Sequence, residues 1–214
     1  MRPATVDGAD QELRLSKIAW KLKSLIAALL HRVVALSDGV ALAMNAKSTL
    51  IAILAARALI ETLAVTALAR SQIKDAVAKA DIEQVGDISF AWLMATRDAS
   101  LVADFPTTKA LNIVTVLDKL AKTNDVLKLI RDQYDWLSEI CHPNGQGGFF
   151  LFGSLDRATT VVTFAAEQNP QRHLDNLHAA LTLLLISEDW IQDLMRLIPT
   201  VALMHGVEEP PCDN

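Results

Sequence analysis

The sequence predicts an all-α protein, a bundle of about six helices with a small β-hairpin between the last two helices. Hydrophobic residues make up 51% of the 214-residue chain, mostly as Leu and Ala, while glycine, proline and aromatic residues are sparse. This composition favours helices. Apolar residues also recur at helical spacing over long stretches, and only the region near residues 148–165 is rich in aromatic and β-branched residues instead.

A chain of this length suits a single domain with a real hydrophobic core. We expect one helical domain over residues 11–205, with the hairpin at about residues 148–165. Residues 1–10 are expected to form a flexible lead, and residues 206–214 a flexible tail.

The first two helices are predicted from continuous apolar stripes. One covers residues 11–36, and the polar segment Ser37–Gly39 is expected to end it. The second begins at about Asn45 or Ser48, either of which can cap a helix, and runs to about Ala80.

Three further helices are predicted before the hairpin. The third covers about residues 87–103 and ends before Phe105 and Pro106. Thr107 or Thr108 then caps a fourth helix that runs to Lys122. Asn124 is expected to cap the fifth.

The hairpin and the last helix complete the fold. The segments FFLFGSLD and RATTVVTF predict two strands around a turn at Gly153–Arg157. Asn169 and Pro170 mark a strong helix start, and Pro199 is expected to stop this helix at Ile198. Its middle is apolar nearly all round, so it should be central.

Charge and hydropathy restrict the classes of partner. The formal net charge is −5 with a pI near 5.5, which is not the basic footprint that duplex nucleic acid requires. The most apolar stretch, Leu50–Ala69, is interrupted by Arg57 and Glu61, so we expect a soluble core helix and no membrane span. Apolar residues on more than one helix face favour a homodimer.

The N-terminus and the cysteines indicate a reducing cytoplasm. The segment MRPATVDGAD has no apolar region after a basic start, as a secretory signal would. The two cysteines, Cys141 and Cys212, form neither a zinc-binding spacing nor a disulfide framework.

Tyr134–Gly148 is the segment whose residues are hardest to explain by core packing. In a helix that begins near Asn124, four polar side chains fall at spacings of three, four and four along one side. Pro143 should end this helix near His142, where the helix dipole favours a protonated imidazole. A histidine that only caps the last carbonyl groups is the alternative. The four polar residues are Arg131, Tyr134, Ser138 and His142.

Arg57 and Glu61 share a face of the second helix on which few other charges occur. We expect both groups to be buried, with Glu61 paired to Arg57 and accepting a hydrogen bond from Tyr134 or His142, because a buried charge requires such partners. A surface ion pair is the alternative interpretation.

No complete catalytic motif is present. The sequence lacks GxSxG, HExxH and phosphate-binding loop patterns. Cys141 lies next to His142, but adjacent helical residues point about 100° apart, which disfavours a thiol nucleophile. Glu61 and His142 would supply only two metal ligands, with Glu188 as the best further carboxylate, so no metal and no cofactor is predicted.

Three segments together resemble an uncharacterised bacterial family of helical domains of unknown function. They are ARALIETL at Ala56–Leu63, YDWLSEICHPNGQG at Tyr134–Gly147, and FGSLD followed by TVVTF. Family members carry an Arg-x-x-x-Glu helix and a later Leu-Ser-x-x-x-His-Pro segment followed by a short hairpin. The resemblance spans about residues 45–195 and implies the helical fold. It directs attention to Arg57, Glu61, Tyr134, Ser138 and His142.

The architecture is more distantly similar to HEPN helical bundles, many of which are RNA-cleaving toxins or defence components that dimerise. Their motif, an Arg followed after four to six residues by a His, is missing here, because Arg131 precedes His142 by eleven positions. This departure argues against ribonuclease activity.

Three hypotheses about function follow. The first is a binding or interaction module whose central pocket of Arg57, Glu61, Tyr134 and His142 recognises a small polar ligand or a protein partner. The second is a ribonuclease or other phosphodiester hydrolase, with His142 as general acid-base, Arg57 or Arg131 near the anionic charge, and Glu61 orienting the imidazole. The third is a purely structural polar cluster.

Overall fold

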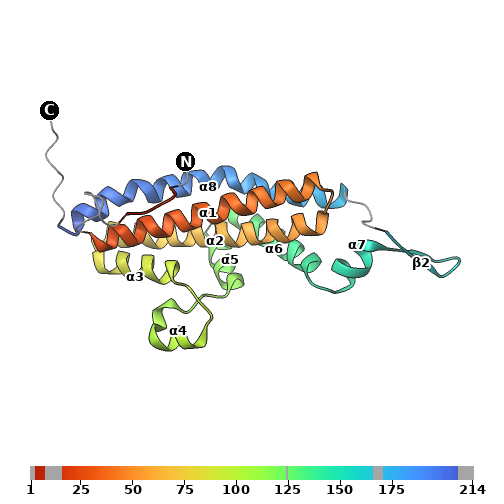
Figure 1. Cartoon of the computed structure of the whole chain (residues 1–214), viewed down its shortest axis with the longest axis horizontal. Helices are drawn as coiled ribbons and strands as arrows, with labels where there is room; N and C mark the ends of the chain where they lie inside the picture. Colours follow the sequence, from red (N-terminus) through yellow and green to blue (C-terminus); the bar gives the residue numbers. More distant parts are fainter. Residues whose placement is uncertain (1–2, 8–15, 124, 166–170, 207–214) are drawn as a thin grey trace. The chain divides into compact units, whose positions relative to one another are not determined.

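The protein is all-α with a small β-hairpin, as the sequence predicts (Figure 1). The computed structural model describes residues 3–7, 16–123, 125–165 and 171–206. Of the eight α-helices within these residues, six have nine residues or more. These are α1 (Lys17–Asn45), α2 (Thr49–Ala78), α3 (Ile82–Leu93), α5 (Ile113–Ala121), α6 (Asp125–Cys141) and α8 (Gln171–Met204).

The remaining elements are short. Helix α4 (Ala99–Asp104) and a 3-10 turn, η1 (Pro106–Thr108), lie between α3 and α5. A π-helical turn, η2 (Gly145–Phe149), and α7 (Phe150–Phe152) follow α6. The antiparallel strands β1 (Gly153–Asp156) and β2 (Val161–Phe164) form the hairpin.

The chain divides into two compact units. Unit 1 comprises Met1–Arg32, Ala64–Val116 and Ile186–Asn214, and unit 2 comprises Val33–Leu63 and Leu117–Leu185. The single domain expected over residues 11–205 stays a prediction. Its N-terminal limit and most of the expected tail lie outside the described residues, as do the expected helix caps Asn124 and Asn169.

Helix α1 continues through Ser37–Gly39, so the predicted end near Leu36 is wrong. The Ser37 hydroxyl donates a hydrogen bond to the Val33 carbonyl one turn earlier (2.7 Å), which satisfies it inside the helix. Val40 and Ala43, just beyond, are buried. Burial of these side chains offsets the weak helix propensity of Ser, Asp and Gly, about 1 kcal/mol for glycine.

The predicted third helix is two helices, because the chain leaves helical geometry between α3 and α4. There Thr96 forms an isolated parallel bridge with Lys109. The Thr96 amide donates to the Thr108 carbonyl, and the Ala110 amide donates to the Thr96 carbonyl, both at 2.8 Å. This pairing with a distant segment is invisible to helical periodicity.

The hairpin lies within its predicted bounds, but its first strand is shorter than expected. The FFLF segment is not a strand, because it forms the end of η2 and α7. The predicted turn at Gly153–Arg157 is wrong, because Gly153–Asp156 forms strand β1 and the turn lies between Asp156 and Val161. Asp156 stabilises this turn by accepting a hydrogen bond from the Ala158 amide (2.9 Å). Local turn chemistry at Asn144 therefore overrides the β-propensity of the aromatic run.

Helix α8 continues past Pro199 to Met204, so the predicted stop at Ile198 is wrong. Proline inside a helix removes one backbone hydrogen bond. Val201 and Ala202, which follow it, are buried in the hydrophobic core of unit 1, and their burial offsets that loss. This core is formed by side chains of α1, α2, α3 and α8, among them Leu22, Ile73, Val85 and Leu194.

An ion-pair network joins α2 to α8 within unit 1. Arg70 donates to Asp193 through Nε (2.9 Å) and also through Nη2. Lys74 lies 3.5 Å and Arg196 3.4 Å from the same carboxylate. The hydrogen bond from Arg70 lowers the pKa of Asp193, and the charges of Arg70 and Lys74 act in the same direction.

The lowered pKa of Asp193 predicts acid sensitivity. A carboxylate whose pKa is lower in the folded than in the unfolded state contributes stability above its unfolded pKa, about 3.9, and this contribution is lost as pH falls through the folded pKa. We expect the free energy of unfolding to decrease less steeply below about pH 4 in Asp193→Asn than in the unmodified protein. Urea unfolding at several pH values measures this, and identical pH profiles would contradict it.

Helices α1 and α2 are long and apolar enough to cross a membrane. Their most apolar 18-residue windows have mean hydropathies of 1.7 and 1.9, and 33% and 56% of the residues in these windows are buried within the protein. Core helices of soluble proteins meet the same criteria of length and composition. The absence of a membrane span stays a prediction.

Candidate functional site

Tyr134 of α6 is the centre of a polar cluster in unit 2. Its side chain is buried, with 3% of its surface exposed. Its hydroxyl accepts a hydrogen bond from Arg57 Nη2 (3.0 Å) and donates one to Glu61 Oε1 (3.1 Å). The predicted hydrogen bond from Tyr134 to Glu61 is therefore confirmed, and it links α6 to α2.

Arg57 and Glu61 are one helical turn apart on α2, and Arg57 Nε lies 3.5 Å from Glu61 Oε1. The side chains are 28% and 29% exposed, so the expectation of full burial is wrong. The Arg57 guanidinium also lies 5.3 Å from the centre of the Tyr134 ring, within cation–π range. Among the described residues Nε has no hydrogen-bond partner, since its approach to Glu61 is an ion pair without hydrogen-bond geometry.

The environment keeps Arg57 cationic. Burial by itself lowers the pKa of Arg57, but the hydrogen bond with Tyr134 and the negative charge of Glu61 more than compensate, so the pKa is raised. The cluster therefore presents a permanent positive charge beside a carboxylate.

Cys141, which lies half-buried at the end of α6, is the fourth member of the cluster. Burial raises the pKa of the Cys141 thiol, while the hydrogen bond and charge of Arg57 lower it and the charge of Glu61 raises it. The net pKa is raised, so the thiol stays protonated and is a poor nucleophile. We use the term polar cluster for Arg57, Glu61, Tyr134 and Cys141.

Helical phase explains why Cys141 rather than His142 joins the cluster. Seven residues along an α-helix turn it by about 700°, which is about 20° from a whole number of turns, whereas eight residues leave a difference of about 80°. Cys141 is seven residues after Tyr134, and His142 is eight. The sequence thus contained the signal for Cys141.

The other predicted site residues lie elsewhere on or after α6. Arg131 forms ion pairs with Asp118 of α5 (2.8 Å from Nε) and with Asp135. The Ser138 hydroxyl is buried and, within the described part of the chain, has no hydrogen-bond partner. Glu188 belongs to unit 1 and accepts a hydrogen bond from Gln192 (3.2 Å).

His142 is exposed directly after the last residue of α6, which ends where Pro143 predicts. Its backbone amide donates to the Ser138 carbonyl (3.3 Å). Across residues 3–7, 16–123, 125–165 and 171–206, its ring makes no hydrogen bond or ion pair with Glu61. The structure therefore unites Arg57, Glu61 and Tyr134, and leaves His142 outside.

The loop after α6 folds back tightly onto the helix end. The Asn144 side chain accepts hydrogen bonds from the amides of Gln146 and Gly147, both at 3.0 Å, and starts η2. Gly147 is buried. A Cβ atom there would lie 2.1 Å from the carbonyl oxygens of Ile140 and His142, so only glycine fits.

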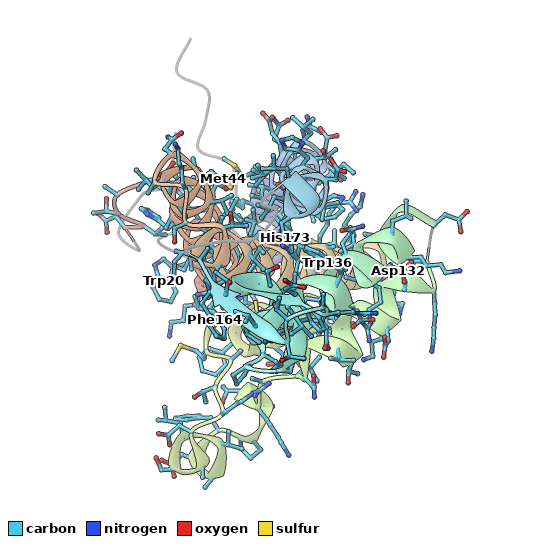
Figure 2. All side chains as sticks on the ribbon, turned by 90° about the vertical axis from the view of Figure 1, so that its right-hand side faces the viewer. Trp20, Met44, Asp132, Trp136, Phe164 and His173 are labelled. Carbon is cyan, nitrogen blue, oxygen red and sulfur yellow. The ribbon has the colours of Figure 1, made fainter. Side chains whose placement is uncertain are left out.

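A second contact joins α6 to α8 in unit 2. The rings of Trp136 and His173 lie with their centres 5.3 Å apart (Figure 2). His173 is buried. Trp136 thus links α6 to α8 separately from the polar cluster.

Among the residues that the structure describes, no three His, Cys, Asp or Glu side chains gather in a way that could hold a metal ion. Comparisons with protein-family models, with curated proteins and with solved structures found no match to this chain.

Proposed function

We propose that the chain is a helical binding module and that the polar cluster in unit 2 binds a small polar ligand. One observation carries the proposal. Two hydrogen bonds hold Arg57, Tyr134 and Glu61 in a fixed order, yet the arginine and glutamate side chains both stay partly exposed. A charged donor and a charged acceptor are thus available next to each other.

The chemistry of the cluster specifies the class of ligand. A guanidinium has five N–H donors and suits a carboxylate or phosphate. The Glu61 carboxylate has acceptor capacity beyond its bond with Tyr134. A complementary molecule presents an anionic group to Arg57 and an N–H or O–H donor to Glu61, as an amino acid does.

The buried Tyr134 prepares the cluster for binding. Because the phenol contacts both charged side chains, each loses less freedom when a ligand arrives. The resemblance to the uncharacterised helical family draws attention to the same three residues but supplies no activity. A carboxylate from a partner chain is the competing occupant.

Removal of the Arg57 charge tests the proposal. We expect a thermal-shift screen with amino acids, mononucleotides and carboxylic acids to find a ligand that stabilises the protein. Arg57→Gln should weaken its binding at least about tenfold, since a charge-assisted pair is lost. Isothermal titration calorimetry measures the affinity. The control Arg157→Gln removes an exposed charge from the hairpin turn of the same unit and should leave the affinity unchanged.

A stabilising ligand that binds equally well to Arg57→Gln would contradict the assignment. So would a screen in which no ligand stabilises the protein while extracts yield a partner chain. A third outcome, in which substitutions in the cluster alter stability but no binding, would favour the structural hypothesis.

The hydrolase hypothesis receives less support from the geometry. It requires an imidazole oriented by Glu61, whereas His142 is exposed and makes no such contact among the described residues. Cleavage of RNA that is abolished in His142→Ala would restore it. Cleavage that survives this substitution would eliminate His142 as the general acid-base.

We also propose that the chain forms a homodimer through its hairpin. The register pairs Gly153 with Phe164 and Leu155 with Val162, so these residues share one face. Three of them are exposed hydrophobic residues, with Phe164 67% exposed. Among the described aromatic rings, only that of Phe149 pairs with Phe164 of this face, with the ring centres 6.3 Å apart.

The opposite face of the hairpin is more polar, with Ser154 opposite Thr163. A two-stranded hairpin is marginal in water, and an antiparallel sheet normally covers its apolar face. A second copy of the chain supplies an identical apolar face. One symmetric contact would then cover the apolar faces of both hairpins.

Substitutions on the two faces test the dimer. We expect the double variant Val162→Ser with Phe164→Ser to be monomeric, because it removes most of the apolar area of this face. Val161→Ser removes an exposed valine from the other face of β2 and should leave the dimer intact. Light scattering after gel filtration distinguishes 23.3 kDa from twice that mass. A monomeric unmodified protein would contradict the proposal.

A further inference from the structure

A groove in unit 1 lies between α4 and the segment that precedes α5. Its volume is about 640 Å³, within the range of small-molecule sites. Its walls are apolar, formed by Ala99, Val102, Ala103 and Ala110. Arg97, Lys109 and the Asn112 amide supply its polar lining. We refer to it as the α4 groove.

The backbone fixes the two segments that carry the cations of this groove. Lys109 is the bridge partner of Thr96, which immediately precedes Arg97. Thr96 forms two main-chain hydrogen bonds, one with Thr108 and one with Ala110, each 2.8 Å long, and they hold the two segments together. Main-chain pairing therefore fixes the backbone of Thr96 against that of Lys109, and Arg97 and Lys109 both line the groove.

Neither cation is neutralised within the described residues. Arg97 and Lys109 are exposed, and neither takes part in an ion pair there. Asp98 is next in sequence, but its Oδ1 accepts hydrogen bonds from the amides of Ser100 (2.9 Å) and Leu101 (3.2 Å) and from the Ser100 hydroxyl. Asp98 and Asp104 do not line the groove.

Two positively charged side chains that line a groove with apolar walls favour a ligand with a negative head and a hydrocarbon tail. The cations raise the local concentration of anions, and Arg97 can bind a carboxylate through two parallel hydrogen bonds. The tail would bury apolar area against Val102 and the alanines. A ligand without a tail would leave the apolar walls uncovered, and a ligand without a charge would leave Arg97 and Lys109 without an anionic partner.

We propose that the α4 groove binds an amphiphilic carboxylate, with its head between Arg97 and Lys109 and its short aliphatic chain along α4. This site belongs to unit 1 and is separate from the polar cluster of unit 2. Its ligand is a free acid of about the size of octanoate, which shares a negative head and an acyl chain with an anionic lipid.

Calorimetry with matched probes tests this proposal on the full chain. We expect octanoate to bind measurably, and acetate (head alone) and 1-octanol (tail alone) to bind at least about tenfold more weakly. The double variant Arg97→Gln with Lys109→Gln should weaken octanoate binding at least about tenfold. The control double variant Lys79→Gln with Arg196→Gln removes the same charge from unit 1 outside the groove and should bind octanoate normally.

Val102→Asp places a negative charge on the apolar wall and should also abolish octanoate binding, while circular dichroism verifies that each variant is folded. The proposal is overturned if octanoate binding is unchanged by loss of Arg97 and Lys109, or if both double variants lose it equally. Binding to vesicles of anionic phospholipid without binding to octanoate would overturn it as well, since a membrane surface would then be the occupant.

Discussion

Replacement of Gly147 by alanine is expected to destabilise the protein by about 3 kcal/mol or more. The added Cβ would lie 2.1 Å from two backbone carbonyl oxygens, those of Ile140 and His142. These atoms belong to the end of α6 and the loop that follows it, and cannot rotate away as a flexible side chain can. Forced overpacking of a buried position typically costs about 1–3 kcal/mol and occasionally more.

Gly148 provides the matched control for this change. It is the next residue of the same π-helical turn, and an added Cβ there meets no atom within 4 Å. We expect Gly148→Ala to change the free energy of unfolding by less than about 1 kcal/mol. The change should be an increase, because alanine reduces the conformational freedom of the unfolded chain. Urea unfolding followed by circular dichroism compares the two variants. Equal effects at both positions would show that the loop does not fold back onto α6 as described.

The same loop shows what the sequence could and could not predict. Pro143 predicts the end of α6 correctly, because the constraint that a proline places on the preceding residue is local. The turn signal at Asn144 is also local. Whether it prevails over the β-propensity of the aromatic run FFLF, however, depends on contacts with the rest of the fold. Whether aromatic residues form a strand depends on what covers them.

Long-range pairing accounts for most of the remaining errors. Helical spacing predicts that six main helices exist, since the burial of one stripe imposes that spacing on the sequence. The predicted starts of two of them are wrong, because α3 begins at Ile82 and not near residue 87, and α5 begins at Ile113 and not after Thr107 or Thr108. The bridge between Thr96 and Lys109 splits a predicted helix through contacts thirteen residues apart. The passage of α8 through Pro199 likewise depends on burial of Val201 in a core assembled from other helices.

The candidate site was partly predictable because its spacing is carried by two helices. The interval of four residues places Arg57 beside Glu61, and polarity on an otherwise apolar face marks Tyr134 as a partner. The approach of α6 to α2 had to be assumed, since no local pattern encodes it. Steps of four residues place His142 near the phase of Tyr134, although Cys141, seven residues after Tyr134, fits the helix better.

Replacement of Tyr134 by phenylalanine is expected to lower the free energy of unfolding by about 2 kcal/mol. The change preserves the ring but removes the hydroxyl that accepts from Arg57 and donates to Glu61. Hydrogen bonds to charged groups contribute about 1.5–3 kcal/mol each when they are lost from a buried site. Both charged side chains are partly exposed and can recover water, so the expected loss is smaller than the sum of two such bonds, which would be about 3–6 kcal/mol.

A double-mutant cycle separates this hydrogen bond from packing of the ring. Glu61→Gln keeps an acceptor oxygen but removes the charge. Because Tyr134 and Glu61 interact directly, the double variant Glu61→Gln with Tyr134→Phe should be more stable, by at least about 0.5 kcal/mol, than the sum of the two single effects predicts. Leu137→Ala, at a fully buried position one turn along α6, reports the cost of lost packing and should show no coupling to Glu61→Gln. The hydroxyl would not hold Arg57 and Glu61 in place if Tyr134→Phe changed stability by less than about 0.5 kcal/mol, or if the effects of Tyr134→Phe and Glu61→Gln were additive. In that case the preorganisation on which ligand binding at the cluster depends would be absent.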